Sequence, residues 1–600
     1  VVHGAAAIHQ AGNLLQITNS PNAIINWQSF SIGANEITRF LQQSASSAVL
    51  NRVTTQNPST ILGALQSNGR VFLINPNGIL FGAGAQVDVA GLVASTLNMS
   101  DADFLGGRLR FTDGLGKSVV NEGSINTGTG GSVYLIGSGV TNNGIIRSPQ
   151  GEVVLAAGNS VELVSPGTPN LRVEITATDN EARNLGQIIS EAGRVGIYAG
   201  LVNHSGTIRA DSAVAEGGRI VLKATKSATL EAGSVSSANG TGGGHISIQS
   251  GDTTLVSGAI EATGSEGKGG RIELLGEQVG LINAVTVDAS GKTGGGSVLV
   301  GGDYQGSNSE IQNATRSYVG PEAVIKADAT GAGDGGKVIV WADDTTHYYG
   351  TISARGGASG GDGGFVEVSG KDTLVFKGTV DTRAPQGKTG MLLLDPANIV
   401  ISTGTGDSAA DGDALNNSFS GVPSGVTGTV VATDNPAAGT LTLFESELEG
   451  IAATTNISLA ATNNITINNL GDNVLNLAQT AGNSVTFTAG GAFSMTTTDT
   501  IQTAGGALNI TAGGSATLGA LATAGGAITV DVGAASAASG VISGAGTSLT
   551  KLGAGTLTLN AANTYTGATN INAGTLALGT ANERIANASD VTVAAGATFN

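Results

Sequence analysis

The chain has 600 residues, of which 95 are glycine, and a formal net charge of −18 at neutral pH. This acidic balance disfavours nucleic acid and anionic membrane surfaces as partners, and no apolar run reaches the length of a membrane span. Apolar residues make up 40% of the chain, which excludes a disordered chain, and the lack of a strict glycine triplet excludes collagen. Small and β-branched residues therefore predict an all-β body with a narrow core and many turns.

Neither end of the sequence has the features of a natural terminus. The first residue is Val1, no basic leader segment is visible, and the last residues stop within a repeating pattern. We expect the sequence to be part of a longer chain from which a leader has been removed. Cysteine is absent, so no disulfide can stabilise the fold.

The stretch from 71 to 81 predicts two buried strands joined by a sharp corner. The apolar runs at 71–74 and 79–81 are typical of buried strands. Between them, Asn75-Pro76-Asn77-Gly78 predicts a tight turn, because proline cannot donate a ladder hydrogen bond and asparagine and glycine tolerate positive φ. Such a corner suits a chain that winds on itself, and none of its side chains is of a catalytic type.

This corner carries a family resemblance. Asn75-Pro76-Asn77-Gly78-Ile79 resembles the NPNGI signature of the haemagglutination-activity domain of two-partner secretion exoproteins, and the text at 23–42 and 47–53 is similar to the high-molecular-weight adhesins. The NPNL motif of filamentous haemagglutinin-type members is replaced by Asn57-Pro58-Ser59-Thr60, which indicates a lost motif or a subfamily without it. The resemblance, over about residues 1–110, implies export by an outer-membrane partner transporter to the surface of a Gram-negative cell. It also implies that Asn75, Pro76, Asn77, Gly78 and Ile79 serve secretion.

Between 206 and 400 the sequence repeats with a period of about 27 residues. One apolar column contains Ile208, Val235, Ile260, Val287, Ile325, Ile352 and Val380. A second strand gives two more columns, Ile220, Ile246, Ile272, Val298, Val338, Val366 and Leu392, and Leu222, Ile248, Leu274, Val300, Val340, Val368 and Leu394. Columns that alternate in and out and stay in phase predict a right-handed parallel β-helix with one coil per repeat.

Three regions are expected along the chain. Residues 1–205 would form the secretion domain with an N-terminal cap that includes Trp27 and Phe30, and 206–400 the regular coils. Residues 401–600, rich in Thr, Ala, Gly and Asn, would form further β-helical repeats, and 549–579 resembles the autotransporter-associated β-strand repeat. The segment 392–399 is interpreted as a boundary.

The sequence contains patterns that resemble catalytic or ligand-binding motifs, but the residues around them do not fit such sites. Residues 331–336 match a dinucleotide-binding glycine pattern, but a strand follows where a helix is required. The five histidines lack metal-ligand spacing, and Asp334 and Asp362 belong to no calcium nonapeptide. We expect no catalytic residue, metal or cofactor. A β-helical polysaccharide-degrading enzyme is a less favoured alternative, because the outward column mixes charge signs.

One repeat is lengthened by an insertion at 303–322. Of the two Trp and seven Tyr residues in the chain, five lie close to it: Tyr304, Tyr318, Trp341, Tyr348 and Tyr349. We expect the insertion to protrude and Tyr304, Tyr318 and Trp341 to lie near one another. The rings would form a ligand surface or cover a loop that folds back over one coil.

The residues and the resemblance together favour a secreted adhesin or haemagglutinin that binds a host-cell or surface receptor, either a protein or a glycan. A secreted exoprotein that binds a haem carrier or another ligand is the alternative, because such proteins have the same secretion domain.

Overall fold

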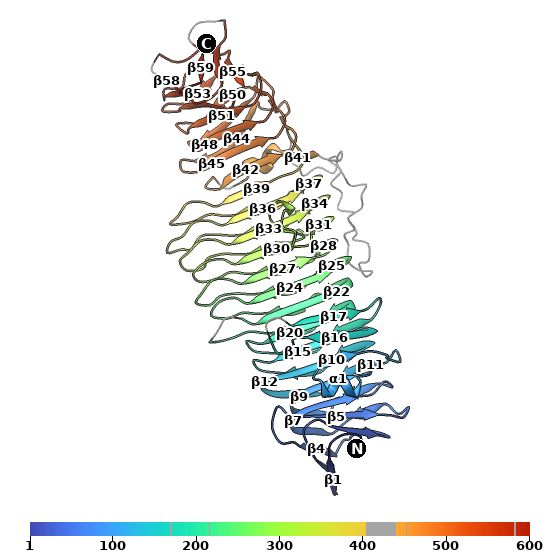
Figure 1. Cartoon of the computed structure of the whole chain (residues 1–600). Helices are drawn as coiled ribbons and strands as arrows, with labels where there is room; N and C mark the ends of the chain where they lie inside the picture. Colours follow the sequence, from blue (N-terminus) through green and yellow to red (C-terminus); the bar gives the residue numbers. More distant parts are fainter. Residues whose placement is uncertain (169–170, 215–216, 404–439, 452, 581–583, 588) are drawn as a thin grey trace. The chain divides into compact units, whose positions relative to one another are not determined.

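The computed structural model describes residues 1–168, 171–214, 217–403, 440–451, 453–580, 584–587 and 589–600. The chain divides into two compact units, here called unit 1 (Val1–Glu277 and Leu281–Gly291) and unit 2 (Gln278–Gly280 and Lys292–Asn600). Each unit is a parallel β-helix whose stacked strands can be followed by colour in Figure 1, so the predicted fold class is confirmed. Helix is confined, in the described residues, to α1 (Asp101–Leu105), α2 (Glu445–Glu449) and the 3-10 turn η1 (Tyr304–Gly306).

Each regular coil of unit 1 adds one strand to each of three parallel ladders, which we call A, B and C. Ladder A contains β3 (Ala23–Trp27), β5 (Ala48–Val53), β7 (Ala64–Ile74), β9 (Gln86–Ser95), β12 (Ser124–Gly137), β15 (Glu152–Ala157), β20 (Arg194–His204), β22 (Arg219–Leu230), β24 (His245–Ser250) and β27 (Arg271–Leu275). Ladder B contains β6 (Ser59–Ile61), β8 (Ile79–Phe81), β11 (Ser118–Asn121), β13 (Gly139–Asn142), β18 (Glu181–Asn184), the ends of β20 and β22, and β25 (Thr253–Val256). Ladder C contains β2 (Leu14–Asn19), β4 (Ile37–Leu41), the starts of β7, β9 and β12, then β14 (Ile145–Arg147), β19 (Gln187–Ile189), β21 (Thr207–Arg209), β23 (Val235–Ser237), β26 (Ala259–Glu261) and β29 (Thr286–Asp288).

Unit 2 has the same arrangement. Its ladder A contains β30 (Ser297–Val300), β33 (Lys337–Ala342), β36 (Phe365–Gly370), β39 (Met391–Leu394), β42 (Asn456–Ala461), β45 (Ser484–Ala489), β48 (Ala507–Ala512), β51 (Ile528–Val532), β54 (Leu549–Leu552), β56 (Thr569–Ile571) and β58 (Val591–Val593). Ladder B contains β31 (Arg316–Val319), β34 (Thr345–Tyr348) and β37 (Thr373–Phe376), then β41 (Thr440–Phe444), β40 (Asn398–Ser402), β43 (Ile465–Ile467), β46 (Phe493–Met495), β49 (Ala516–Leu518), β52 (Ser536–Ala538), β55 (Thr556–Leu559), β57 (Thr575–Leu578) and β59 (Thr598–Phe599). Ladder C contains β32 (Val324–Lys326), β35 (Thr351–Ser353) and β38 (Thr379–Asp381), and later β44 (Val474–Thr480), β47 (Thr500–Ala504), β50 (Ala520–Ala522) and β53 (Ile542–Ser543). The strand β28 (Gln278–Leu281) lies where the sequence passes between the units.

The inward columns predicted for the second strand of each repeat are confirmed. In unit 1, Ile220 pairs with Ile246 and Ile246 with Ile272, and in unit 2 Val298 pairs with Val338. All of these side chains are fully buried. Side chains alternate between the two faces of a strand, so a register kept from coil to coil places the same column in the core each time.

The prediction for Val235 is wrong. Ile208 pairs with Ser236, which is buried, and Val235 is only half-buried. His204 pairs with Leu230 and Thr207 with Val235, so the corner at 231–234 holds four residues where the corner at 205–206 holds two. The extra residues shift the strand that follows, and a hydroxyl takes the inward position.

Glycine at the entry to ladder A is required by close stacking of the corners. A Cβ on Gly244 would lie 2.2 Å from the carbonyl oxygen of Gly218 in the coil before, and one on Gly270 would lie 2.1 Å from that of Gly244. Any side chain there would force neighbouring coils apart.

The N-terminus of unit 1 is covered by a hairpin. β1 (Ala6–Ala11) pairs antiparallel with β2, which in turn pairs parallel with β4. Trp27 ends β3, and its ring meets that of Phe30 at 5.6 Å, while Phe30 stacks on Phe40 at 6.4 Å. The predicted cap is therefore present, and the hairpin closes the edge that would otherwise offer unpaired backbone groups.

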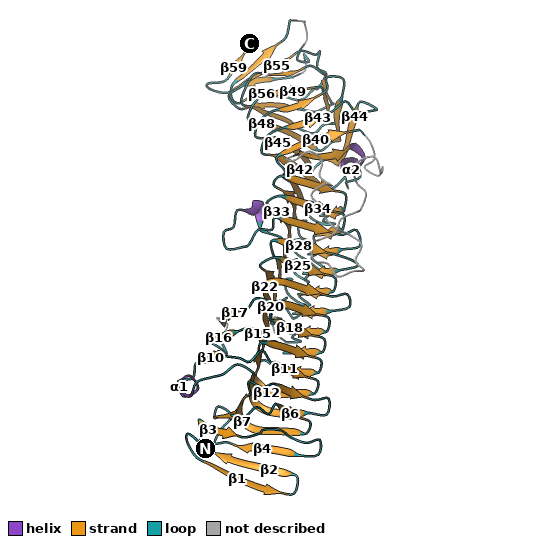
Figure 2. Cartoon of the chain, turned by 90° about the vertical axis from the view of Figure 1, so that its right-hand side faces the viewer, coloured by secondary structure: helices purple, strands orange, loops and turns teal. Residues whose placement is uncertain are grey.

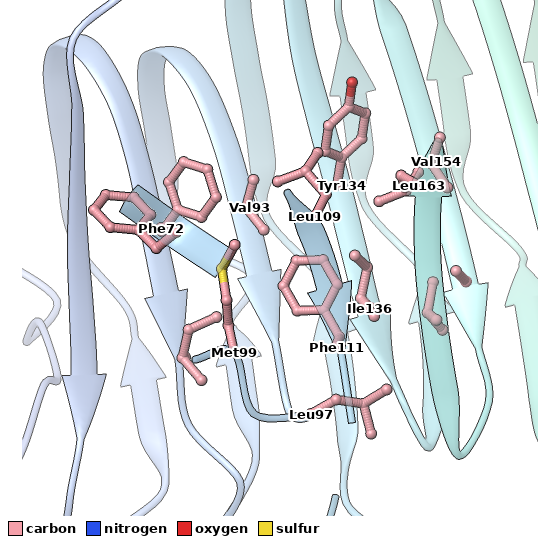
Figure 3. Packing of buried hydrophobic residues seen from close by; sticks show 14 of the residues in the cluster. Phe72, Val93, Leu97, Met99, Leu109, Phe111, Tyr134, Ile136, Val154 and Leu163 are labelled. Atoms are coloured by element: carbon pink, nitrogen blue, oxygen red, sulfur yellow. The ribbon is translucent and has the colours of Figure 1, made fainter. Parts of the chain in front are cut away.

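Unit 1 also has an outer layer on ladder A. The helix α1 and a three-stranded antiparallel sheet of β10 (Leu109–Phe111), β16 (Ser160–Val164) and β17 (Arg172–Thr176) cover outward apolar side chains of the ladder. Figure 3 shows Phe72, Val93 and Tyr134 close to Met99, Leu109 and Phe111 in this second apolar cluster. Both faces of ladder A are buried here, which explains the continuous apolar runs at 71–74 and 133–136.

The predicted boundaries after 205 and 400 stay predictions. Strand order departs from chain order in ladder B of unit 2, where β41 lies on one side of β40 and β43 on the other. The segment 392–399, interpreted as a boundary, contains the end of β39 and the start of β40. Of the region 401–600, residues 404–439 lie outside the described part of the chain.

Candidate functional site

The corner after β7 is a turn closed by its own asparagine. β7 ends at Ile74 and β8 begins at Ile79. The backbone N–H of Gly78 donates to the carbonyl of Asn75 at 3.2 Å, and the backbone N–H of Asn77 donates to Oδ1 of Asn75 at 3.0 Å. Gly78 has φ of +119°, a conformation that favours glycine. The residue types at 75 and 78 are thus set by turn geometry.

The same corner is tied to the coil that precedes it. Asn75 is fully buried, and its Nδ2 donates to the carbonyl of Asn57 and to Oγ of Ser59, both at 2.9 Å. Nδ2 of Asn77 donates to the carbonyl of Thr55 at 2.7 Å. The Asn57-Pro58-Ser59 segment, interpreted from sequence as the position of a lost motif, is therefore the structural partner of the corner.

The corner has no titratable side chain, so its chemistry is limited to hydrogen bonding and shape. Ser59 pairs with Ile79 across the β6–β8 ladder, and the Ser59 N–H donates to the Gly78 carbonyl at 2.9 Å. Asn77 and Pro76 are half-buried, which leaves part of each at the surface. The arrangement can present a fixed polar edge, and it supplies no acid, base or nucleophile.

Unit 1 also contains a ladder of buried asparagine side chains that we did not predict from the sequence. Nδ2 of Asn121 donates to Oδ1 of Asn142 at 2.8 Å, and Nδ2 of Asn142 donates to Oδ1 of Asn184 at 2.8 Å. The next coil has His204 in this place, 3.2 Å from Asn184, and burial lowers the pKa of this histidine. All four side chains are fully buried. The signal was the spacing N-x-G-x-I at 121–125, 142–146 and 184–188, with histidine as the first residue at 204–208.

The insertion occupies residues 301–315, between β30 and β31, and the coils on either side keep their register. Its base is closed by the Ala314 N–H, which donates to the Gly301 carbonyl at 2.6 Å. The loop folds back onto the outer face of ladder A, where η1 lies beside β33, as Figure 2 shows. Nζ of Lys337 bonds to Asp303 at 2.6 Å, and the backbone N–H of Gln305 donates to both carboxylate oxygens of Glu367 at 3.2 Å.

The five aromatic residues near the insertion fall into three separate groups. Tyr304 is 42% exposed and meets Phe365 edge-on at 5.7 Å, while Trp341 is buried under the loop with Leu299 and Ile339. The ring of Tyr318 pairs with that of Tyr349 at 5.9 Å, and Tyr348 is fully buried against Phe376 at 5.2 Å. The structure thus brings Tyr304 and Trp341 to the loop and places Tyr318 with Tyr349.

Two carboxyl groups, Asp303 in the loop and Glu367 beneath it, have pKa values shifted in opposite directions. Burial raises the pKa of Glu367 to about 7, against which the hydrogen bond from the Gln305 backbone acts. Burial would also raise the pKa of Asp303, but hydrogen bonds from Asn308 and Lys337 outweigh it and lower the value to about 2. The loop is therefore held by one charged anchor and one buried acid that favours its neutral form.

In the described residues, no group of three or more His, Asp or Glu side chains is arranged to hold a metal ion. Nor does any helix in that part of the chain have the length and apolar character needed to cross a membrane.

Comparison with protein families gives two matches. The model of the TPS secretion domain matches residues 2–237, and the model of the passenger-associated transport repeat matches residues 549–578. The first contains the corner at 75–79, and the second coincides with the repeat expected at 549–579.

Comparison with individual proteins gives relatives in Haemophilus influenzae. One heme/hemopexin-binding protein is 35% identical over 209 residues, which are 33% of this chain and 23% of the relative. Another is 42% identical over 80 residues, 13% of this chain and 9% of the relative. The chain therefore spans less than a quarter of the length of these relatives. The crystal structure of the HMW1 secretion domain is 35% identical, with a TM-score of 0.51, and the match covers 64% of this chain and 97% of that domain.

Proposed function

This chain belongs to the two-partner secretion exoproteins, and from that premise we propose that an outer-membrane partner transporter exports it through its N-terminal region to act as a surface adhesin. It is a secreted protein of Gram-negative bacteria. The observation that carries the proposal is the corner at 75–79, whose buried asparagine fastens one coil to the coil before it inside the matched secretion domain.

The corner gives the secretion domain a defined order of assembly. Asn75 can form its hydrogen bonds only after Asn57 and Ser59 have folded into the preceding coil. A chain that emerges from a transporter N-terminus first would fold outside the cell in that order, and each coil would offer its edge to the next. The hairpin of β1 and β2 prevents growth in the other direction.

The test is secretion of the full chain with its partner transporter. Replacing both Asn75 and Asn77 by Ala removes the contacts to Thr55, Asn57 and Ser59, and we expect less protein outside the cell. Asn143→Ala, at an exposed corner position, is the matched control. Wild-type secretion of the double variant would show that the corner has no role in export.

A second candidate is binding of a haem carrier, favoured by the names of the two relatives. Adherence of whole cells with and without the gene tests the adhesin. Retention of haemopexin by the purified chain tests the alternative. Loss of adherence without retention of haemopexin supports the adhesin, and the reverse result supports the carrier-binding protein.

We also propose that the chain has no polysaccharide-degrading activity. Glu273, a buried carboxylate on ladder A, lies 2.6 Å from Nε of Arg271 and 3.5 Å from Nε2 of His245. Burial would raise the pKa of Glu273, but hydrogen bonds from His245 and Arg271 outweigh it and lower the value to about 2. Such a carboxylate stays ionised and cannot donate a proton as a general acid. Release of reducing ends from acidic polysaccharides would contradict this proposal.

A further inference from the structure

A groove of about 910 Å³ runs along the corner between ladders C and A of unit 2. Three successive glycine-rich corners form its floor. The Ala329 N–H donates to the Arg355 carbonyl at 2.9 Å, and the Gly356 N–H donates to the Arg383 carbonyl at 3.0 Å. Small and hydroxylated residues line it together with three cations: Ala329, Thr330, Arg355, Ala358, Arg383, Ala384, Pro385, Lys388, Thr389 and Thr480.

The first arginine is fixed by a buried carboxylate. Asp328 has a side chain only 9% exposed, and its Oδ1 accepts from Ser353 Oγ at 2.5 Å and from the Arg355 N–H at 2.7 Å. Its Oδ2 accepts from Nη2 of Arg355 at 3.2 Å. One nitrogen of the guanidinium is thereby held, while about half of the side chain stays exposed, at 52%.

The second arginine, one coil later, is fixed by a carboxylate of its own coil. Arg383 donates from Nε and Nη2 to the two oxygens of Asp381, at 2.8 and 2.6 Å, and its side chain is 55% exposed. Ser353 pairs with Asp381 in the ladder, so the two arginines follow equivalent positions. Their backbones are separated by the strand spacing of about 4.8 Å. The third cation, Lys388, has its backbone N–H held by Asp362 at 2.8 Å.

We infer that this groove binds an acidic polysaccharide, through its carboxylate or sulfate groups. Guanidinium groups held by a carboxylate through only part of their donors keep the others for a planar or tetrahedral anion at little entropic cost. Cations repeated at the coil spacing suit a polymer with regularly placed charges, and the small hydroxylated floor suits its sugar rings. The carboxylates of Asp328 and Asp381 offset the charge of the two arginines, so anion binding depends on the guanidinium N–H groups that do not contact these carboxylates. The inference rests on the proposed adhesin function and names its ligand class.

The experiment measures binding of the full 600-residue chain to three immobilised polymers. Dextran sulfate presents sulfate, polygalacturonate presents carboxylate, and neutral dextran is the blank. The test variant carries Arg355→Gln and Arg383→Gln, which are half-exposed and leave the core intact. The control is Arg209→Gln, an exposed arginine outside the groove that pairs with Asp211 at 3.3 Å in an earlier coil.

We expect at least one acidic polymer to bind the native chain and the Arg209 variant equally, and to bind the double variant at least tenfold more weakly. The polymer that shows this difference identifies the anion. Equal binding by all three proteins, binding of neutral dextran to the same extent, or no binding of either acid overturns the inference. Adherence of whole cells is read separately, so an adhesin that uses another surface still adheres when both arginines are replaced.

Discussion

At the scale of single residues, stability in this fold depends on the direction in which each strand residue points. Ile272 is fully buried, and it stacks on Ile246 in a core only a few side chains wide. Lys223, on the same ladder but directed outward, is exposed. Both residues lie in β-strands, but one side chain is in the core and the other is in solvent. The same substitution therefore changes the free energy of unfolding by very different amounts at the two positions.

Replacing Ile272 by Asp is expected to lower the free energy of unfolding by several kcal/mol, because a carboxylate would be buried without a partner. Lys223→Asp is the control and is expected to change it by less than about 0.5 kcal/mol. Denaturant unfolding followed by circular dichroism measures both. Equal effects would show that Ile272 does not lie in the core.

A second prediction at this scale concerns Glu367 and pH. Its folded pKa of about 7 is above its ordinary value of 4.5, so folding favours the protonated form. The stabilising contribution is complete below pH 4.5 and is lost as the pH rises through 7, a change of up to about 3 kcal/mol. Glu367→Gln is therefore expected to flatten the unfolding free energy between pH 4.5 and 7, whereas Glu322→Gln, at an exposed position, keeps the native profile.

The residues that sequence reasoning placed correctly are those whose neighbours in the chain decide their position. The in–out columns of ladder A follow from strand alternation, and the turn at 75–78 follows from proline and glycine. Val235 was misplaced because the lengths of two corners in different coils decide which residue faces inward. Asn75 was assigned to a turn, but its contacts with Asn57 and Ser59 depend on stacking between coils, which one sequence does not display.

At the scale of elements, corners between strands are held together by side chains that reach the backbone of the next coil. Oδ1 of Asp334 accepts from the Asp362 N–H at 2.8 Å, and Oδ1 of Asp362 accepts from the Lys388 N–H at 2.8 Å. Asn456 does the same for Ser484 at 2.7 Å. These side chains satisfy donors that glycine-rich corners would otherwise leave without partners, which accounts for the aspartates in such corners.

The inserted loop at 301–315 is the element whose role the aromatic residues left open. It covers Trp341, which is 4% exposed, together with Leu299 and Ile339. Sequence predicted the extra length and its place in one repeat. A loop that folds back over one coil was one of the two sequence interpretations, but the contacts that hold it, with Lys337 and Glu367 on neighbouring strands of ladder A, could not be predicted.

Replacing residues 304–312 by two glycines is expected to lower the melting temperature, because burial of Trp341 and its apolar neighbours is worth about 2–4 kcal/mol. The chain has two tryptophans, so a Trp27→Phe parent makes Trp341 the sole reporter, and its emission is expected to shift to the red. The unmodified parent is the control. Unchanged adherence with a lower melting temperature supports a covering role. Lost adherence with an unchanged melting temperature would instead identify a ligand surface at Tyr304.

At the scale of the whole molecule, the corner that we propose to act in export lies in unit 1. The hairpin cap, the corner at 75–79, the asparagine ladder and the outer layer over ladder A all lie within Val1–Glu277. Unit 2 contains the inserted loop, the groove with Arg355 and Arg383, and the passenger-associated repeat. We therefore expect unit 1 to be recognised by the partner transporter and to fold first, and unit 2 to bind the ligand.

Two fragments, each behind the same export leader and produced with the partner transporter, test that division. We expect residues 1–277 to reach the medium in a protease-resistant form, because this fragment keeps its cap, its core and its outer layer. Residues 278–600 are expected to stay inside the cell, since they lack the corner at 75–79. Fragment 1–277 with Asn75 and Asn77 replaced by Ala serves as the control, and its export is expected to fall with that of the full-length double variant. If residues 278–600 reached the medium as well as residues 1–277, recognition by the transporter would depend on β-helical coils in general, and the corner would retain only its part in joining two coils.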